Sequence, residues 1–202
     1  MISSLPRPVA PPDSDAAAVA ASLADPEAFA EVFERHYPAV HRYLARRLGA
    51  DLADELAAEA FAVAFAKRRR YDVAYPDARP WLLGIATHLA RHHWRREERE
   101  LRAYARTGRD PCAPAADEEA ATRADSVATG PALAAALAAL PREERDVLLL
   151  YAWEELGYPE IARALRIAPG TVKSRLHRAR RRVRQSLAAA GELEPDRGDA
   201  DE

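Results

Sequence analysis

The chain has 202 residues, of which 49% are hydrophobic but only 7% aromatic, and alanine supplies much of the remainder. Alanine is the best helix former and contributes little burial energy, so this composition favours small helical bundles with thin cores. No run of β-branched residues indicates a strand. We therefore expect an all-α protein that forms one large domain or two small ones with a linker.

Charge is segregated along the chain, although the net charge is only −2. The stretch from Arg163 to Arg184 carries nine basic residues and no acid. The stretch after Gly191 carries six acids against a single base, Arg197. Such segregation says more about partners than the net charge does.

Cys112 is the only cysteine, which excludes an intrachain disulfide and a cysteine-based zinc cluster. The N-terminus is rich in proline and lacks the apolar core of a signal peptide. No stretch approaches the roughly 18–20 apolar residues that are needed to span a bilayer. We expect a cytoplasmic protein.

Residues 14–105 are expected to form a first helical domain, which follows a proline-rich, disordered tail at 1–13. Apolar residues recur at spacings of three and four through this domain and indicate amphipathic helices. The expected helices cover residues 15–24, 26–48, 51–69 and 81 to about 105.

The start of the long helix after residue 25 is the best-defined boundary in this domain. Asp25 is a suitable N-cap, Pro26 occupies the first helical position, and Glu27 adds an acid to the first turn. We expect Pro38 to kink this helix and Gly49 to end it.

A second domain is expected at residues 131–190, after a flexible linker at 106–130. The linker contains hardly any aliphatic residue, and apolar order resumes at Pro131. A helix should start at Pro141, and two short helices should follow at 158–165 and about 169–188. The acidic residues 191–202 are expected to form a solvated tail.

The two short helices have the pattern of a helix-turn-helix. Ile161 and Leu165 face the core, and Ala162 lies where only a small side chain fits between closely packed helices. Ile167 fills the turn. The turn position that often holds glycine is Arg166 here, which would cost about 1 kcal/mol if its φ is positive.

The helix from about residue 169 has two faces. Its buried stripe is Val172, Leu176, Ala179 and Val183. The opposite face carries short polar and long basic groups, which meet base edges and phosphates in a major groove. The alternatives are a solvated basic helix or a generic helical hairpin, but the small residue, the short turn and the acid-free face together favour a recognition helix. The candidate DNA-binding residues on it are Thr171, Lys173, Ser174, His177, Arg178 and Arg181.

Both halves of the chain resemble one family. The C-terminal stretch ALAALPREERDVLLLY…EIARALRIAPGTVKSRLHRAR resembles region four of the extracytoplasmic-function sigma factors of bacterial RNA polymerase. ADELAAEAF at 53–61 and RPWLLGIATHLARHHWRR at 79–96 resemble their region two. The resemblance covers about 160 residues in the family's order, with a linker where larger sigma factors carry a further domain.

The resemblance implies that the second helix docks on the clamp coiled coil of the largest polymerase subunit. The candidate residues for this contact are Leu52, Glu55, Leu56 and Glu59. Glu55 and Glu59 match acidic positions of the family, whereas Ala58 stands where the family usually has Gln. One polar contact to core polymerase is therefore missing. The polymerase flap is the second contact with polymerase that the family implies.

The resemblance also assigns the loop at 71–79 and the start of the third helix to the −10 promoter strand. Melting a duplex and capturing an unstacked base suits aromatic and cationic side chains. The candidates are Tyr71, Trp81, His88, Arg91, His92 and Arg95. His88 and His92 replace the family's common Asn and Asp. In the second domain, Lys173, Ser174, His177 and Arg178 match the positions that read the −35 element.

Several features have a structural alternative. Trp81 opens an apolar run, so it is a core residue at least as readily as a stacking platform. His88 and His92 lie one turn apart, but without a third ligand nearby we predict no metal site. Residues 67–70, KRRR, suit a helix C-terminus as well as a phosphate contact.

We expect a transcription initiation factor that is not an enzyme and needs no cofactor. The sequence has no Gly-rich phosphate loop, nucleophile–base pattern or metal-ligand cluster. Its expected partners are core RNA polymerase, promoter DNA and an anti-sigma factor, with no membrane. The alternative is a stand-alone helix-turn-helix regulator whose N-terminal helices sense a signal or dimerise. A further hypothesis is that the acidic tail at 191–202 competes weakly with DNA for the basic helix.

Overall fold

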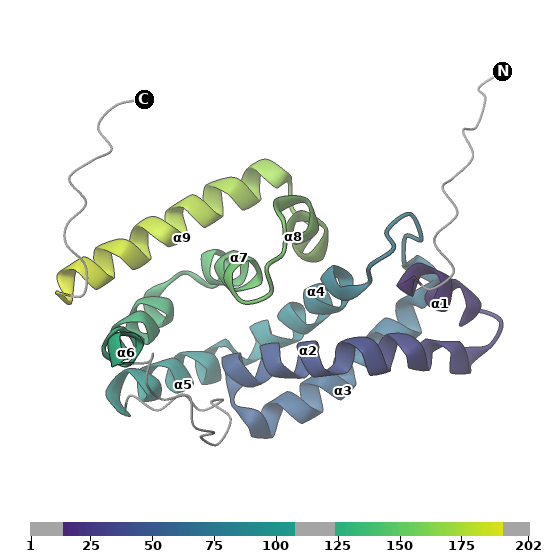
Figure 1. Ribbon diagram of the computed structural model, residues 1–202, viewed down its shortest axis with the longest axis horizontal. Helices are drawn as coiled ribbons and strands as arrows, with labels where there is room; N and C mark the ends of the chain where they lie inside the picture. The colour runs from purple at the N-terminus through teal and green to yellow at the C-terminus, as the bar shows by residue number, and fades with distance from the viewer. Residues whose placement is uncertain (1–13, 108–123, 192–202) are drawn as a thin grey trace.

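The computed structural model describes residues 14–107 and 124–191, and every regular element within these ranges is a helix (Figure 1). The predicted all-α fold is confirmed. We call residues 14–107 the first helical unit and residues 124–191 the second. The first contains α1 (Asp15–Ala21), α2 (Ala30–Leu48), α3 (Ala50–Lys67), α4 (Arg79–Ala90) and α5 (Trp94–Thr107), with 3₁₀ turns at Pro26–Phe29, Arg68–Arg70 and Arg91–His93. The second contains α6 (Ala124–Ala139), α7 (Arg142–Ala152), α8 (Tyr158–Leu165) and α9 (Pro169–Ala189).

The sequence signals at both ends of α2 act as predicted. The Asp25 carboxylate accepts a hydrogen bond from the Glu27 amide at 3.1 Å, and Pro26 opens a 3₁₀ turn that leads into α2. Gly49 ends α2 with a φ of 84°, a left-handed conformation that glycine adopts without strain. The α2 assignment continues through Pro38.

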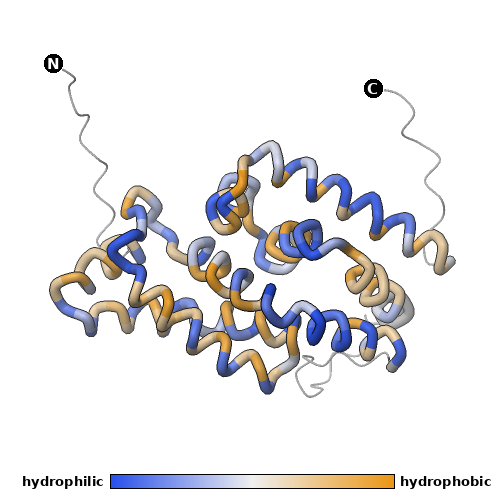
Figure 2. Tube along the Cα trace, turned by 180° about the vertical axis from the view of Figure 1, so that it is seen from behind, coloured by the Kyte–Doolittle hydropathy of each residue, from blue (hydrophilic) through white to orange (hydrophobic). Residues whose placement is uncertain are grey.

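Alanine allows the helices of the first unit to approach closely. Ala53, Ala57 and Ala60 of α3 are fully or almost fully buried, and they pack in the same core as Leu44 of α2 and Leu82 of α4. Hydrophobic and hydrophilic residues alternate along these helices in the Cα trace (Figure 2), as amphipathic helices require. The core of the unit therefore combines small side chains on one helix with larger ones on its neighbours.

Asp15 anchors α1 to the rest of the first unit. It is 3% exposed, and its carboxylate accepts hydrogen bonds from Arg35, from His36 Nε2 at 2.7 Å and from the Ala78 amide at 2.7 Å. Burial alone would raise the pKa of Asp15, but the hydrogen bonds from His36 and Ala78 lower it to about 2. A single carboxylate thus connects α1, α2 and the residue that precedes α4.

Two helix boundaries differ most from the prediction. The third helix is not continuous, because the 3₁₀ turn Arg91–His93 separates α4 from α5. No Gly or Pro marks this point, so periodicity gave no warning of it. α6 begins at Ala124, inside the predicted linker, and continues through Pro131. Gly130 contributes to the packing there, since a Cβ at this position would lie 2.4 Å from the Tyr104 hydroxyl of α5.

The predicted tails, the middle of the linker and Cys112 lie outside the described residues. The two units pack against each other, α8 on α4 and α6 on α5 (Figure 1). The buried apolar residues of both units belong to one cluster. No helix in the described ranges is both long and apolar enough to cross a membrane.

Candidate nucleic-acid interface

The predicted helix-turn-helix is formed by α8 and α9. Arg166 ends α8 in the left-handed conformation, with φ 54° and ψ 48°. The Ile167 amide donates to the Ala162 carbonyl at 3.0 Å and closes the turn. The φ of Arg166 is therefore positive, which is the condition under which the sequence analysis attached a cost to this residue. An arginine here costs about 1 kcal/mol relative to glycine.

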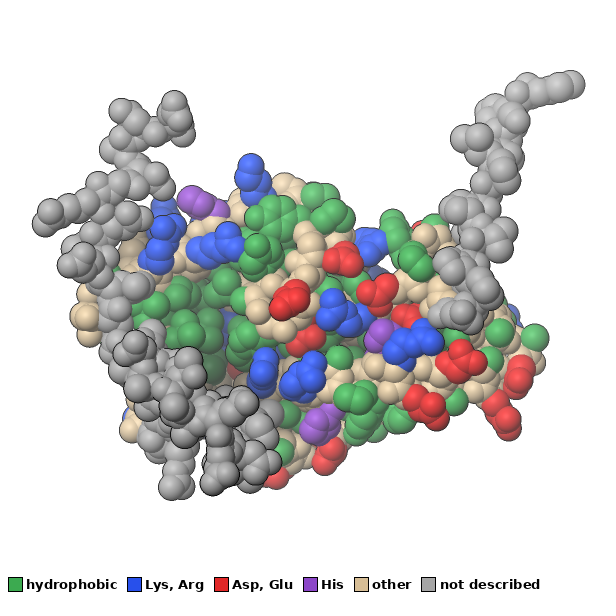
Figure 3. Space-filling view, viewed as in Figure 1, with side chains coloured by type: hydrophobic (Ala, Val, Ile, Leu, Met, Phe, Trp, Pro, Cys, Tyr) green, Lys and Arg blue, Asp and Glu red, His purple; other side chains and the backbone are tan. Residues whose placement is uncertain are grey.

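The buried and exposed faces of α9 follow the predicted division. Val172, Leu176 and Ala179 are buried, and Val183 is half-buried. On the opposite face Lys173, Ser174, His177 and Arg181 are exposed, and Thr171 is half-buried. Basic side chains follow α9 along the edge of the molecule that is uppermost in Figure 3. This exposed face has the length and polarity that a major groove accepts.

Three other arginines of α9 fasten it to α7. Arg175 lies 3.0 Å from Glu143, while Arg178 and Arg182 lie 3.0 and 3.1 Å from the two carboxylate oxygens of Glu144. The Glu144 side chain is only 9% exposed, so these pairs fix the orientation of α9. Arg178, which the sequence assigned to base reading, has its Nε committed to this pair although the side chain is 43% exposed.

The structure gathers the candidate −10 residues on and around α4. The rings of Tyr71 and Trp81 are 5.0 Å apart, and those of His88 and His92 are 5.7 Å apart, edge to face. Arg95 covers the ring of Trp94 at 5.5 Å. We call the six candidate residues the promoter-strand surface: Tyr71, Trp81, His88, Arg91, His92 and Arg95.

Tyr71 and Trp81 have packing roles as well. The Tyr71 hydroxyl donates to the Tyr75 carbonyl at 2.5 Å. Burial raises the pKa of Tyr71, so the phenol stays protonated and available as a donor. Trp81 is half-buried against the core, and it also lines a cleft of about 260 Å³ between α4 and α8. Trp81 therefore packs against the core, and its role as a stacking platform stays a prediction.

A possible metal-ligand group occurs elsewhere in the described ranges. Ligand atoms of Asp15, His36 and Asp77 lie within 4.8 Å of one another. Both Asp15 oxygens already accept hydrogen bonds from Arg35, His36 and the Ala78 amide. An arginine in contact with the carboxylate disfavours a cation, so we assign this group to anchoring α1.

The predicted polymerase-binding residues on α3 divide by burial. Glu55 and Glu59 are exposed and Leu52 is half-buried, so all three can reach a partner. Leu56 is 2% exposed and packs in the core, so its prediction as a contact residue is wrong and it supports the helix from inside. Ala58 is exposed between the two acids.

Sequence reasoning missed an aromatic patch between α2 and α3. Phe33 is 40% exposed on α2, and its ring lies 4.9 Å from Tyr37 and 4.9 Å from Phe61 of α3. The three-and-four spacing of apolar residues in this domain predicted a buried face, and it did not indicate that Phe33 is exposed. The exposed ring of Phe33 gives the α2–α3 pair an apolar spot at its surface.

A second apolar surface lies on the other unit. It is a groove of about 310 Å³ between α6, α7 and α9. Leu133 is 38% exposed at its edge, and Leu137 and Trp153 form part of its wall. The alternation of alanine and leucine in α6 predicted a helix, but it did not indicate an open groove.

The sequence also gave no sign of a buried charge cluster between the two units. Its members are Arg47 of α2, Arg91 of the 3₁₀ turn, Glu97 of α5, and Arg145 and Asp146 of α7. They are separated by up to 99 residues in the chain, and no local pattern links residues that far apart.

Taken as an arrangement, an exposed recognition helix and a separate aromatic, histidine and arginine surface define a DNA-binding protein with two contact points. The comparisons with known proteins identify the family to which this protein belongs. Residues 32–100 match the family model for sigma-70 region 2, and residues 131–183 match that for sigma-70, region 4.

Full-length relatives extend the match to most of the chain. It is 34% identical over 180 residues to the ECF RNA polymerase sigma factor SigM of Mycobacterium tuberculosis, covering 86% of this chain and 85% of SigM. It is 35% identical to the RNA polymerase sigma factor CarQ of Myxococcus xanthus, covering 83% of this chain and 92% of CarQ. The match to the RNA polymerase sigma-E factor of Streptomyces coelicolor is 45% identical but spans only 30% of that protein. The chain belongs to the extracytoplasmic-function sigma factors of the sigma-70 family.

Solved structures support the same fold. CnrH, in complex with the cytosolic domain of CnrY, matches with a TM-score of 0.61 at 22% identity, covering 88% of this chain and 99% of that one. The sigma factor RpoE of Bartonella quintana, in complex with the anti-sigma factor NepR, matches with a TM-score of 0.56 at 21% identity, covering 80% and 98%.

Proposed function

We propose that this chain binds core RNA polymerase and directs it to promoters through two DNA contacts. The exposed face of α9 reads the −35 element, and the promoter-strand surface captures the −10 strand. The observation that carries this proposal is the acid-free, exposed face of α9, whose orientation is fixed from behind by ion pairs to α7. The chain contributes no catalytic step, since RNA synthesis belongs to the polymerase.

Base reading at the −35 element falls to Ser174 and His177 in the middle of the exposed face, with Arg181 one turn further along. Lys173 beside them suits a phosphate, because a lysine is a flexible point charge. Arg178 contributes to the same contact while it holds Glu144. The first turns of a recognition helix are the part that enters the major groove.

Capture of the −10 strand falls to the aromatic and basic groups around α4. An unstacked base has a π-face that stacks on an aromatic side chain, and Trp81 offers its exposed part beside Tyr71. His88 and His92 are both exposed one turn apart, and each ring can donate a hydrogen bond to a base. Arg95 supplies a cation for the phosphate backbone.

Two surfaces are assigned to core polymerase. Glu55, Glu59 and Leu52 on α3 would meet the clamp coiled coil of the largest subunit. The groove that contains Leu133 and Trp153 on the second unit would take an apolar helix of the polymerase flap. An anti-sigma factor that covers either surface would prevent assembly. The protein would act in the cytoplasm, where the polymerase is.

The test is run-off transcription with core polymerase on a library of genomic fragments. We expect promoter-specific transcripts that core polymerase alone does not produce. A Lys173→Ala/His177→Ala double variant should lose most of them, whereas Gln185→Ala, an exposed polar residue later on the same helix and outside both proposed polymerase surfaces, should not. The absence of specific transcripts with the unaltered chain would refute the proposal.

A further inference from the structure

The exposed face of α5 carries arginines at a regular spacing. They are Arg95, Arg99, Arg102 and Arg106, at successive intervals of four, three and four residues. At about 3.6 residues per turn, these intervals place all four side chains in one narrow stripe along the helix. All four are exposed, whereas Glu97 and Leu101 on the opposite side are buried. We call Arg99, Arg102 and Arg106 the arginine ridge, while Arg95 belongs to the promoter-strand surface.

Ion pairs within the chain do not explain the arginine ridge. Arg102 lies 3.9 Å from Glu98, a long separation for an ion pair, and its side chain remains 63% exposed. Among the residues that the structure describes, neither Arg99 nor Arg106 pairs with an acid. Like charges three and four residues apart destabilise a helix slightly. The ridge therefore weakens α5 on its own, and its presence points to a partner outside the helix.

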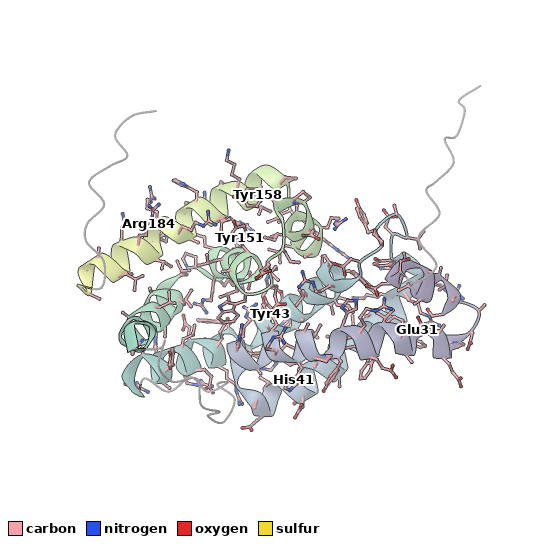
Figure 4. All side chains as sticks on the ribbon, viewed as in Figure 1. Glu31, His41, Tyr43, Tyr151, Tyr158 and Arg184 are labelled. Atoms are coloured by element: carbon pink, nitrogen blue, oxygen red, sulfur yellow. The ribbon has the colours of Figure 1, made fainter. Side chains whose placement is uncertain are left out.

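The basic charge is local to α5 within the first unit. The exposed charged residues of α3 are mostly acids, namely Asp51, Asp54, Glu55 and Glu59, against a single base, Lys67. Across the whole molecule, Glu31 of α2 and Arg184 of α9 lie towards opposite ends (Figure 4). The small net charge thus conceals separate acidic and basic surfaces, and a basic surface attracts a polyanion such as nucleic acid.

The arginine ridge continues the promoter-strand surface. His88 and His92 precede Arg95 at intervals of four and three, so a line of exposed side chains leads from α4 through the 3₁₀ turn into α5. The edge-to-face contact of the two histidine rings at 5.7 Å shows that they remain neighbours across the turn. The match to sigma-70 region 2 ends at residue 100. Arg102 and Arg106 therefore lie beyond the part of the chain that this family match covers.

The dimensions of the stripe suit a row of phosphates. The helix rises about 16 Å from Arg95 to Arg106, at about 1.5 Å per residue. Phosphates of one strand of duplex DNA follow one another about every 3.4 Å along the axis, so the stripe spans about five of them. An arginine binds a phosphate through two parallel N–H donors, and such contacts carry no sequence information.

From this exposure, spacing and continuity, we propose that the arginine ridge binds the backbone of the DNA duplex between the −10 and −35 elements. The inference rests on the proposed function, which assigns the −10 strand to the promoter-strand surface and the −35 element to α9. Along the chain, α5 leads from the first of these surfaces towards the unit that carries the second. The duplex connects the same two surfaces, so it meets α5 next to the −10 element. The ridge supplies affinity there, while base reading stays with α4 and α9.

The test removes the charge of the ridge and then restores it. Arg99→Gln/Arg102→Gln/Arg106→Gln removes three charges and keeps long side chains that favour a helix. The matched control substitutes Lys at the same three positions, because lysine still binds phosphate as a point charge. Circular dichroism and thermal unfolding establish that both variants are helical and folded.

The first measurement is binding of the full chain to a fluorescein-labelled DNA duplex of random sequence. All chains carry Lys173→Ala and Arg181→Ala, so that α9 contributes less. Fluorescence anisotropy over a series of salt concentrations counts the phosphates that are neutralised, since each lowers the slope of log K against log salt by about 0.9. We expect the Gln variant to lose a slope of about three and the Lys variant to keep it. An unchanged slope in the folded Gln variant would overturn the inference.

The second measurement locates the contact on a promoter that the run-off experiment identifies. Hydroxyl-radical footprinting compares polymerase complexes that contain the unaltered chain or the Gln variant. We expect the Gln variant to lose protection of the backbone just upstream of the −10 element and to keep protection of the −10 element itself. Full protection with the Gln variant would overturn the inference. The first measurement needs neither promoter nor polymerase, so its result stands apart from the success or failure of the proposed function.

Discussion

The two DNA-facing surfaces of this sigma factor differ in what covers them. The exposed face of α9 has Lys173, Ser174 and His177 open to solvent. The promoter-strand surface has Arg91 committed to Asp146 and Trp81 facing a cleft that α8 closes. The exposed face of α9 is therefore open to a partner, whereas the promoter-strand surface is partly engaged in contacts within the chain.

The comparison also separates two kinds of stabilising contact. Ion pairs on α9 are partly exposed, with Arg178 43% and Arg182 50% exposed, so each contributes little to stability. Ion pairs between the units are buried, so removing one member strands its partner in a low-dielectric site. Substitutions at the two places should therefore affect different properties. Changes on the exposed face of α9 should affect DNA binding, whereas changes in the ion pairs between the units should affect folding stability.

The largest effect is expected from Arg47→Ala. It leaves Glu97 and Asp146 buried without their main cation, which should lower the free energy of unfolding by about 3–5 kcal/mol. Chemical denaturation monitored by circular dichroism measures this change. Arg46→Ala is the matched control, since Arg46 is the exposed neighbour on the same helix and should change stability by about 1 kcal/mol or less. Equal effects of the two variants would contradict the assigned role of the cluster.

The next largest effect tests the role of the exposed face of α9. His177→Ala removes a candidate base contact and should cost about 1–3 kcal/mol of discrimination between −35 sequences. Lys173→Ala should weaken binding to all sequences alike and reduce the salt dependence by about one charge. Electrophoretic mobility shifts of the polymerase complex, over a series of promoter variants and salt concentrations, distinguish the two. Similar behaviour of both variants would mean that α9 does not divide base and phosphate contacts in this way.

Asp15→Asn tests whether Asp15 supports the start of α4, which carries part of the promoter-strand surface. Asp15 fixes the Ala78 amide just before α4, so the loss of its charge should lower the free energy of unfolding by about 1–3 kcal/mol at neutral pH. The pKa of Asp15 is lowered from 3.8 to about 2 in the folded chain. Its stabilisation is therefore complete above about pH 4 and disappears as the pH falls towards 2. Urea unfolding of both chains should show their difference shrinking over that interval, and a constant difference would contradict the assignment.

The smallest effect should come from the turn before α9. Arg166→Gly relieves the positive φ of 54° and should stabilise the second unit by up to about 1 kcal/mol. Arg166→Ala keeps the strain and should give no such gain. Thermal unfolding of the two variants compares them directly. Greater stability of the alanine variant would show that the turn is not strained.

The exposed face of α9 could be predicted from the sequence because the residues that determine it are close together in the chain. The spacing of Val172, Leu176 and Ala179 defines the buried stripe within one helix, and the exposed face follows from geometry. The same local reasoning singled out Arg166 as the turn position where a positive φ would be costly. The family resemblance supplied the order of the two domains and the candidate residues on α4.

The contact that covers the promoter-strand surface could not be predicted, because it depends on residues that are far apart in the chain. Arg47 and Asp146 meet across 99 positions, and each alone has the pattern of a solvated charge on an amphipathic helix. Gly84 of α4, where a Cβ would lie 2.3 Å from the Ala164 carbonyl oxygen of α8, had no local signal for this contact. Leu56 was misassigned for the same reason, since the residue that matches a family motif can still face the core of α3 and its neighbours.

The most direct test of the account is footprinting of a promoter fragment with the chain alone, with core polymerase alone and with both. Permanganate reactivity of the −10 strand should be read in the same reactions. The account predicts protection at both the −35 and −10 elements, together with strand opening, only when the chain and core polymerase are present together. Sequence-specific protection by the chain alone, unchanged by core polymerase, would contradict it and favour a stand-alone regulator.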